Sequence, residues 1–524
     1  MSILRSAATV GGLTMVSRVL GFGRDVMMAA VLGTGPIADA FFVAFRFPNL
    51  FRRLFAEGAF NAAFVPLFAK QLEAQGPAGA RQFGEEAMNA LLFALLVFSG
   101  VAELAMPWAM YLIAPGFAGD PAKFDLAVLL TRIAFPYLVF MSLTALISGV
   151  LNSLGKFAAA AAAPIVLNVL LIGVLLALLG AGLEDGERAF AGKALAWGVS
   201  LAGALQLLLV YVAASRAGFR LVLARPRLTP GVRRLLALGV PGVIAGGITQ
   251  INILIGTIIA SLQAGAVSYL YYADRIYQLP LGVVGVAIGV VLLPDLARRL
   301  KAGDDSGAGK MQNRALETAM LFTVPAAVAL AVIAAPIISV LFERGNFGPG
   351  DTGATAPALA AFAFGLPAFV AIKVFSPGFF AREDTRTPML FAGVSVAVNI
   401  IVSLVLFATI GHVGIAIATS LAGWVNAGLL MVALWRRGFF NADHRLARHL
   451  GLIVVASAVM GAVLWLLWGG LAGWLDRAQP LWTRAGALAV LITAGLAVFW
   501  AMVEITGVAR LRDIMRSRRL PPGG

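Results

Sequence analysis

The chain has 524 residues, of which 60% are hydrophobic and 12% charged, and its mean hydropathy is +0.92. A soluble domain carries about 25% charged residues, so this composition excludes an ordinary soluble protein and indicates a polytopic membrane protein. The absence of cysteine excludes disulfides, thiol catalysis and thiolate metal sites. The net charge of +15 would suggest nucleic acid in a soluble protein, but here the loops explain it and no nucleic-acid partner is expected.

Fourteen segments in chain order are long and apolar enough to cross a bilayer, which needs about 20 residues. They run near 8–32, 37–68, 87–113, 125–152, 158–181, 192–215, 232–262, 266–294, 315–342, 352–380, 388–410, 412–435, 450–472 and 484–507. We therefore predict an all-α polytopic membrane protein with 14 transmembrane helices. The first apolar run carries Arg18 and Arg24 and lacks a small-residue exit, so no cleavable signal is expected.

The Lys and Arg residues between these segments predict the orientation. If the N-terminus is inside, 26 of them fall in inner segments and 6 in outer loops. Positive residues accumulate on the cytoplasmic side of membrane proteins. We therefore expect a multi-pass membrane protein with both termini in the cytoplasm.

The chain also repeats itself. SLAGALQLLLVYVAASRAGF (200–219) matches SLAGWVNAGLLMVALWRRGF (420–439) without a gap, and Pro136 and Asn168 pair with Pro367 and Asn399. Spans 1–6 and 7–12 are thus predicted to be two parallel copies, with the substrate site between them. The predicted domains are an N-lobe at 1–222, a C-lobe at 223–440, two additional spans at 441–509 and a basic cytoplasmic tail at 510–524.

The first two spans are unusually charged for membrane segments. They contain eight charged side chains: Arg18, Arg24, Asp25, Asp39, Arg46, Arg52, Arg53 and Glu57. Each charge at membrane depth costs about 2.5–3.5 kcal/mol on insertion scales, so such residues normally face a bundle interior or a wet cavity. Asp274 and Arg275 form a further charged pair in span 8, and Arg132 and Lys373 are single cations elsewhere.

Helical spacing predicts which of these side chains share a face. In the first span, Thr14, Arg18 and Asp25 lie on one face, from which an ideal helix turns Arg24 away. In the second span, four residues share a face: Asp39, Arg46, Arg53 and Glu57. The functional interpretation is a cationic cavity in which Arg side chains bind an anion through paired donors, and the acids hold those Arg residues or form gates. The alternative is structural ion pairing between helices.

Weaker signals lie in the second half. Asn399 and Thr419 could ligate a cation, although hydrogen bonding between helices is the favoured explanation of such polar groups. Arg382, Asp384 and Arg386 in FFAREDTRTP could clamp an inner gate or simply form a solvated turn. The sequence contains no P-loop, metal motif or catalytic triad, so an enzyme is not expected.

Four stretches resemble signatures of one family, the MurJ (MviN) lipid II flippases of the multidrug/oligosaccharidyl-lipid/polysaccharide (MOP) exporter superfamily. They are TMVSRVLGFGRD, ADAFFVAFRFPNLFRRLFAEGAFNAAFVP, YYADRIYQLP and FFAREDTRTP. The resemblance extends over essentially the whole chain. It implies a protein of peptidoglycan biosynthesis that maintains cell shape. Such a protein moves lipid II, an undecaprenyl-pyrophosphate-linked precursor, from the cytoplasmic to the periplasmic leaflet of the bacterial inner membrane.

The resemblance also implies a mechanism. Two lobes alternate their access around a cationic central cavity, and spans 13 and 14 shape a groove for the lipid tail. By motif match, the substrate-binding arginines fall on Arg18, Arg24, Arg52 and Arg275, and the important acids on Asp25, Asp39 and Glu57. No cofactor is implied beyond the membrane potential and, in some members, Na⁺. A monomer is expected, with lipid II, membrane lipids and other cell-wall synthesis proteins as partners.

Other functions stay open from the residues alone. A flippase for another polyprenyl-linked oligosaccharide would need a similar cationic cavity. A cation-coupled drug exporter would favour acids over arginines in its first half, and a polyprenyl-phosphate enzyme would need catalytic carboxylates in sizeable outer loops. A scaffold without transport would gain nothing from buried charge.

Overall fold

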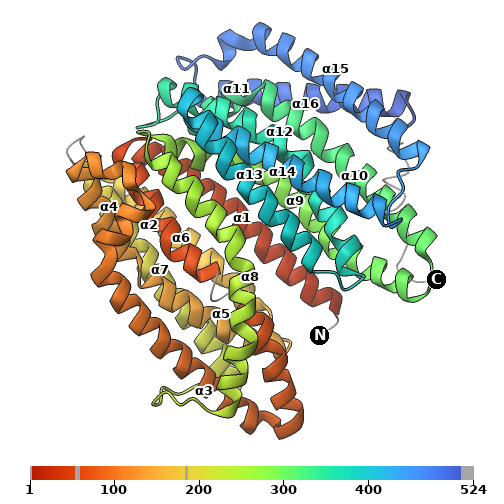
Figure 1. The fold of residues 1–524 in the computed structure, drawn as a ribbon. Helices are drawn as coiled ribbons and strands as arrows, with labels where there is room; N and C mark the ends of the chain where they lie inside the picture. The colour runs from red at the N-terminus through yellow and green to blue at the C-terminus, as the bar shows by residue number, and fades with distance from the viewer. Residues whose placement is uncertain (1–2, 54–58, 183–186, 509–524) are drawn as a thin grey trace. The chain divides into compact units, whose positions relative to one another are not determined.

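The computed structural model describes residues 3–53, 59–182 and 187–508. Within these ranges the protein is entirely helical, with sixteen α-helices and one 3₁₀ helix (Figure 1). The structure separates into two compact units, of which the first contains the described residues up to Ser268 together with Arg344–Phe347. The second contains Tyr269–Glu343 and the described residues from Gly348 onward.

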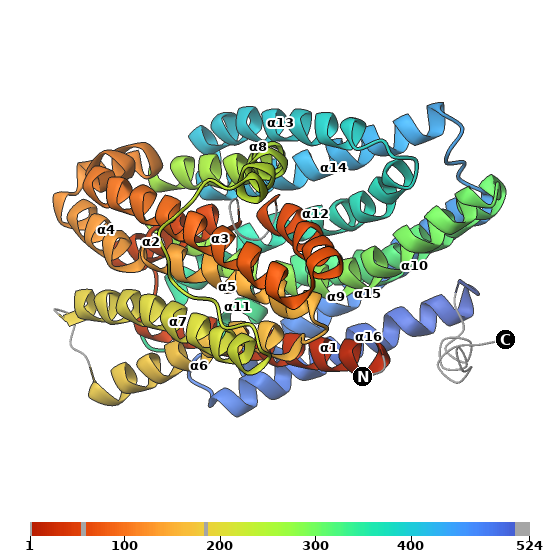
Figure 2. The ribbon, with the colours of Figure 1, turned by 90° about the horizontal axis from the view of Figure 1, so that it is seen from below.

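Unit 1 holds the elements of the first half of the chain. They are α1 (Ile3–Leu32), α2 (Pro36–Arg52), α3 (Ala59–Ile113), η2 (Pro115–Gly119), α4 (Pro121–Ala134), α5 (Tyr137–Ser153), α6 (Ala158–Ala181), α7 (Arg188–Arg216) and α8 (Pro230–Ser261). Within this unit α1 packs along α6, α6 packs along α7, and α2 packs on α4 (Figure 2). These pairings bring the charged first two helices against the interior of the unit.

Unit 2 holds the elements of the second half. They are α9 (Ala266–Lys301), whose first turn belongs to unit 1, α10 (Asp305–Val332), α11 (Ala334–Phe342), α12 (Pro349–Phe380), α13 (Arg386–Ile410), α14 (His412–Arg436), α15 (His444–Leu475) and α16 (Leu481–Ile505). Within this unit α14 packs against both α12 and α13, and α15 runs beside α16 (Figure 1).

Ten helical stretches of the described residues are long and apolar enough to cross a membrane: α3, α4 with α5, α6, α7, α10, α12, α13, α14, α15 and α16. The other four predicted spans also coincide with helices, namely α1, α2 with the start of α3, α8 and α9. Large apolar side chains on the spanning helices are exposed, as at Leu104 (77%) and Trp108 (72%) of α3. Such exposure fits contact with lipid hydrocarbon, where apolar side chains need no burial. The structure therefore confirms an all-α polytopic membrane protein.

Several predicted boundaries differ from the structure for identifiable reasons. Residues 69–86 are predicted to connect spans 2 and 3, but α3 is helical on both sides of a kink at Gly76, whose φ of 69° is in the left-handed region. Span 4 is interrupted before Tyr137, because Pro136 lacks the amide hydrogen that would continue the helix. Span 9 breaks at Ile333, where α10 ends and α11 begins.

The predicted repeat has structural counterparts in each unit. α7 ends at Arg216 and α14 at Arg436, and each is followed by a left-handed glycine, Gly218 or Gly438. α8, the first helix of the predicted C-lobe, packs on α3 within unit 1. The predicted lobe boundary at 222/223 stays a prediction.

Candidate functional site

Arg24 in α1 is buried, with 6% of its surface exposed, and so is its neighbour Asp25. The Arg24 guanidinium donates from Nη2 and Nε to Asp25 Oδ1 at 2.7 and 3.1 Å. It also donates from Nη1 to Asn168 Oδ1 on α6 at 3.0 Å. The long Arg side chain thus reaches an acid that the ideal helix would place on a different face.

Asn168 on α6 fixes the position of the Arg24 guanidinium through hydrogen bonds to α1. Its Nδ2 donates to the backbone oxygen of Ser17 at 2.8 Å, and its amide group lies against Gly21, where a Cβ would come within 3.4 Å of Nδ2. The amide therefore donates to α1 while accepting from Arg24, which sets its orientation. A buried cation is tolerated only when a counter-charge and hydrogen bonds replace its water, and Arg24 has both.

The remaining arginines of the first two helices are more accessible. Arg18 is exposed, and no hydrogen bond or ion pair joins its side chain to another residue that the structure describes. Arg46 is half-buried and donates to Thr257 Oγ1 of α8 at 3.4 Å. Arg52 is half-buried and donates from Nε to Asn49 Oδ1 at 3.0 Å, whereas Arg53 is exposed. Glu57 lies outside the described residues.

The charged pair of α9 lies in unit 2. The Arg275 guanidinium carbon stands 4.6 Å from the ring centroid of Tyr271, a distance at which a cation and an aromatic face attract each other. Asp274 accepts a hydrogen bond from Gln278, one turn further along α9. Both charged side chains are half-buried.

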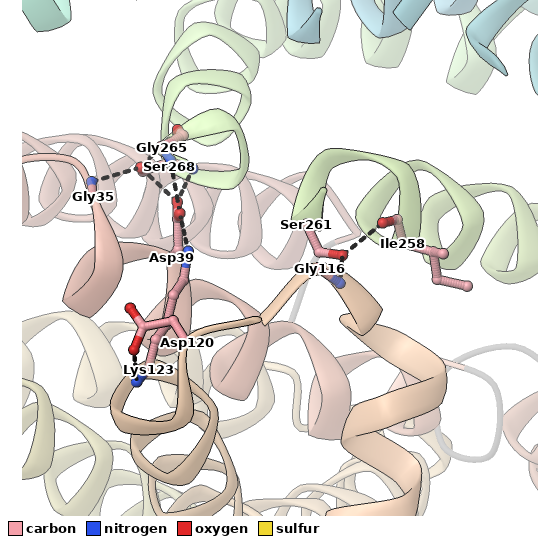
Figure 3. A network of polar contacts seen from close by, with 9 residues as sticks. All are labelled: Gly35, Asp39, Gly116, Asp120, Lys123, Ile258, Ser261, Gly265 and Ser268. Atoms are coloured by element: carbon pink, nitrogen blue, oxygen red, sulfur yellow. Dashed lines mark hydrogen bonds and ion pairs between the residues drawn. The ribbon is translucent and has the colours of Figure 1, made fainter. Parts of the chain in front are cut away.

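Asp39 in α2 is the most completely buried of the predicted acids that the structure describes, with no exposed surface. Its carboxylate receives hydrogen bonds from the backbone N–H of Gly265 (2.9 Å) and Ser268 (3.0 Å) and from Ser268 Oγ (2.8 Å), all in the first turn of α9 and the residue before it (Figure 3). Lys123 Nζ of α4 completes the set at 2.8 Å.

The Asp39 cluster joins three elements through physically complementary groups. The first amides of a helix have no partner within it and carry partial positive charge, so a carboxylate is stabilised there. Lys123 has 7% of its surface exposed, and its Nζ lies 4.0 Å from the Phe117 ring centroid, so its charge is balanced by Asp39 and by an aromatic face. Nearby, the Gly116 N–H donates to Ser261 Oγ at 3.2 Å (Figure 3).

Sequence reasoning missed three members of these clusters. Lys123 is one of the six cations in the predicted outer loops, Asn168 is predicted only as part of the repeat, and no sequence pattern points to Ser268. One local signal existed: Asp120 begins a Pro-containing helix start and accepts from the Lys123 N–H at 3.1 Å, which places Lys123 in the first turn of α4.

The two predicted single cations, Arg132 and Lys373, both lie beside backbone atoms of another helix. Arg132 is exposed and donates from Nε to the Glu103 oxygen at 3.1 Å. Lys373 is half-buried beside Gly285, at which a Cβ would come within 2.8 Å of its Nζ.

The FFAREDTRTP turn between α12 and α13 is ordered by its own polar groups. Asp384 accepts from the Thr387 hydroxyl at 2.6 Å, from the Thr387 N–H at 2.9 Å and from Arg437 Nη1 at 2.6 Å. These hydrogen bonds, the Thr387 hydroxyl first, lower the pKa of Asp384 to about 2. Arg382 packs over the Phe439 ring at 3.9 Å, and burial lowers the pKa of its guanidinium. Arg386 begins α13.

Asn399 and Thr419 lie together in unit 2. Asn399 Oδ1 accepts long hydrogen bonds from Thr419 Oγ1 and Ser403 Oγ, each at 3.4 Å. All three side chains are neutral, and the described part of the chain contains no group of three or more His, Cys, Asp or Glu placed to hold a metal ion. A cation site at Asn399 and Thr419 stays a prediction.

Solved structures define the class of this fold. A structure titled "Lipid II flippase MurJ, inward closed conformation" superposes with a TM-score of 0.78 at 24% identity, covering 97% of this chain and 99% of its own. A multidrug resistance MATE family transporter of the MOP superfamily, in an inward-facing conformation, superposes at 0.62 with 15% identity, covering 84% and 98%. The fold is therefore that of MOP and MATE transporters.

Sequence comparisons identify the family within that class. Residues 28–475 match the family described as "Lipid II flippase MurJ". The chain is 53% identical over 519 residues to a probable lipid II flippase MurJ of Rhizobium meliloti, covering 99% of this chain and 96% of the relative. It is 35% identical over 517 residues to the lipid II flippase MurJ of Burkholderia cenocepacia, covering 97% and 98%. The chain belongs to the MurJ lipid II flippase family and is a transporter rather than an enzyme.

Proposed function

We propose that this protein moves lipid II from the cytoplasmic to the periplasmic leaflet of the bacterial inner membrane by alternating access. Family membership supports the substrate, and the chemistry of the first two helices suits it. The head group of lipid II carries a pyrophosphate, which is an anion with several hydrogen-bond acceptors. Arg side chains bind such oxygens through paired N–H donors.

The observation that carries the proposal is the state of Arg24. It is a buried cation in the membrane-spanning part of the chain, fixed by Asp25 and by Asn168 in a defined orientation. Charge at membrane depth is costly, so its retention favours a functional role. Arg18, which is exposed and lies nearer the start of α1, supplies donors that no described residue occupies. In this proposal Arg18, Arg24, Arg52 and Arg275 bind the head group.

The Asp39 cluster is proposed to act as a gate element. The carboxylate ties α2 and α4 to the first turn of α9 through one ion pair and three hydrogen bonds. An alternating-access cycle needs elements that are closed in one state and open in another. In this scheme, Asp25, Asp274, Arg46, Arg53 and Glu57 hold other ion pairs that break and re-form, and the membrane potential resets the cycle.

The proposed topology has fourteen spans with both termini in the cytoplasm, two lobes at 1–222 and 223–440, and a lipid-tail region at 441–509. α1, α2, α8 and α9 would supply the four spans beyond the ten candidates. Exposed apolar side chains on α15 and α16, such as Val454, Trp465 and Leu496, support contact with hydrocarbon there. The tail at 510–524 lies outside the described residues.

Complementation tests the proposal. A strain depleted of its own lipid II flippase would express this chain or its single variants Arg18→Ala, Arg24→Ala, Arg52→Ala and Arg275→Ala, at membrane levels checked by immunoblot. Lipid II reaching the periplasmic leaflet would then be scored. We expect rescue by the parent chain and loss with the four variants. Arg81→Ala is the matched control, because Arg81 forms an exposed ion pair with Glu85 one turn away.

The outcomes separate the alternatives. Rescue by every arginine variant would mean that these residues form structural ion pairs only. Failure of a well-expressed parent chain would contradict lipid II as the substrate and would favour another polyprenyl-linked oligosaccharide. Arg24→Lys keeps the charge but loses the paired donors, so partial loss in this variant would show that geometry matters beyond charge.

A further inference from the structure

The segment that joins α7 to α8 is strongly cationic. Residues 216–234, here called the basic segment, contain six arginines: Arg216, Arg220, Arg225, Arg227, Arg233 and Arg234. All six side chains are exposed. Such a cluster next to a membrane-spanning helix has the composition of segments that bind anionic lipid head groups.

Among the described residues, no acid pairs with the arginines of the basic segment. The sequence contains no Asp or Glu between Glu187 and Asp274. No hydrogen bond or ion pair joins the side chain of any of the six arginines to another described residue. Glu86 of α3 contacts the segment at the Thr229 hydroxyl, from which it accepts a hydrogen bond at 2.7 Å, and the neighbouring Glu85 pairs with Arg81 at 3.3 Å.

The backbone of the basic segment is nevertheless held in place. Residues 219–229 form neither helix nor strand, and the buried Asn89 of α3 receives the Ala224 N–H at 2.9 Å while donating to the Val222 oxygen at 3.1 Å. The Tyr211 hydroxyl donates to the Leu221 oxygen at 3.1 Å. These bonds satisfy backbone groups that no helix or sheet pairs, so the arginines are presented from a fixed scaffold.

Apolar side chains alternate with the arginines and are equally exposed. Leu223 and Leu228 have 70% and 63% of their surface exposed, and Val222 has 52%. Exposed leucines beside arginines match the two chemistries of a membrane interface, where apolar groups enter the acyl boundary and cations meet phosphates. A partner that is only charged, such as free phosphate, would leave the leucines in water.

A second basic stretch in the same chain differs in these respects. Residues 298–310 contain Arg298, Arg299, Lys301 and Lys310, but the first two pair with acids. Arg298 contacts Asp295, and Arg299 Nη1 lies 2.9 Å from Asp304 Oδ2. This stretch, here called the paired stretch, provides a control with similar positive charge and compensating acids.

We infer that the basic segment binds anionic phospholipid head groups of the bilayer in which the protein sits, at a surface separate from the transport site. The phosphate of phosphatidylglycerol or a related lipid would meet the arginines, and Leu223 and Leu228 would enter the interface. The inference does not depend on the identity of the transported lipid.

The absence of cysteine makes a direct test possible. A single Leu223→Cys variant would carry a bimane label and be reconstituted in nanodiscs of phosphatidylcholine with increasing phosphatidylglycerol. Quenching of the label by brominated phosphatidylglycerol, compared with brominated phosphatidylcholine, reports which lipid lies beside the segment. We expect preferential quenching by the anionic lipid, weakened by high salt because exposed charges are screened. A label at Ala302→Cys in the paired stretch should show a much smaller preference.

Charge variants test the cause. Changing Arg220, Arg225, Arg227 and Arg233 to Gln should raise the phosphatidylglycerol fraction needed for half-maximal quenching by about tenfold or more, since each such cation contributes about 1 kcal/mol near an anionic surface. The matched control changes four cations of the paired stretch to Gln, namely Arg298, Arg299, Lys301 and Lys310. This control should leave the phosphatidylglycerol fraction for half-maximal quenching unchanged. Equal shifts in both variants, or no lipid preference at Leu223→Cys, would overturn the inference.

Two further experiments distinguish binding of anionic lipid by the basic segment from binding of a free anion and from transport. If soluble pyrophosphate added to nanodiscs that contain phosphatidylglycerol abolishes the preferential quenching at Leu223→Cys, the ligand is a free anion and the lipid assignment is wrong; we expect no such competition. Complementation by the four-arginine variant reports transport independently. Failure of the lipid test with intact complementation would overturn this inference and leave the proposed function untouched.

Discussion

The Lys123–Asp39 pair gives the sharpest test of the gate element. Lys123→Met removes the cation and keeps a similar volume, leaving the Asp39 carboxylate buried with its three hydrogen bonds from the start of α9. Removing one partner of a buried ion pair costs about 3–5 kcal/mol. Since the helix N-terminus still stabilises the carboxylate, we expect the lower end, about 3 kcal/mol.

That energy should appear as easier opening of the cluster. Ala266 adjoins the cluster and has no exposed surface, so in this cysteine-free chain an Ala266→Cys thiol should react with a maleimide only when the cluster opens. A cost of about 3 kcal/mol corresponds to an increase in labelling rate of roughly 150-fold in Lys123→Met, because every 1.4 kcal/mol is a factor of ten. The rate would be measured in detergent at fixed pH and salt.

Lys193→Met is the matched control, because Lys193 lies on α7 of the same unit and is exposed. It makes the same chemical change and should leave the rate within a factor of two or so. If Lys123→Met labels no faster than Lys193→Met while Asp39→Asn does, the carboxylate is held by the helix N-terminus alone. The ion pair would then have no part in the gate.

Three further predictions follow from other contacts. Asn168→Leu removes the acceptor of Arg24 and should abolish complementation as Arg24→Ala does, whereas an effect on protein level alone would contradict this. The pKa of Asp384 is lowered to about 2, so the stability that its carboxylate contributes is complete above about pH 4 and is lost as the pH falls toward 2. Asp384→Asn should therefore abolish the fall in Tm that this carboxyl group causes between pH 4 and pH 2. Gly33→Ala should lower Tm, because φ is +61° and the added Cβ would lie 2.3 Å from the Asn346 oxygen, unlike Gly173→Ala in open space.

The positions of the helices could be predicted because apolar length is a local property. Wherever their residues are described, all fourteen predicted spans coincide with helices, and the clearest errors lie at 69–86, 136 and 333. At Gly76 one left-handed residue redirects a helix without ending it as a loop would. Hydropathy does not record such a conformation, because it measures the apolarity of side chains and not backbone angles.

The side-chain partners of the site could be predicted only in part. Helical spacing gave the faces of α1 and α2, but an Arg side chain is long enough to reach the adjacent Asp25 from another face. Asn168 lies 144 residues from Arg24, and Lys123 lies 84 residues from Asp39. Contacts at such separations arise from packing of α1 on α6 and of α2 on α4, which no local pattern contains.

The difference between the charged regions lies in their neighbours rather than in their residue types. Arg24 and Lys123 are each buried beside an acid, whereas the six arginines of the basic segment are exposed with no acid paired to them among the described residues. A buried pair responds to loss of one partner through conformation, because the remaining charge must find water or open the structure. An exposed cation responds through whatever anion it meets outside the protein. The same substitution of a cation by a neutral side chain should therefore change thiol reactivity at Ala266 for Lys123 and lipid preference at Leu223 for the basic segment, and neither readout should respond to the other change.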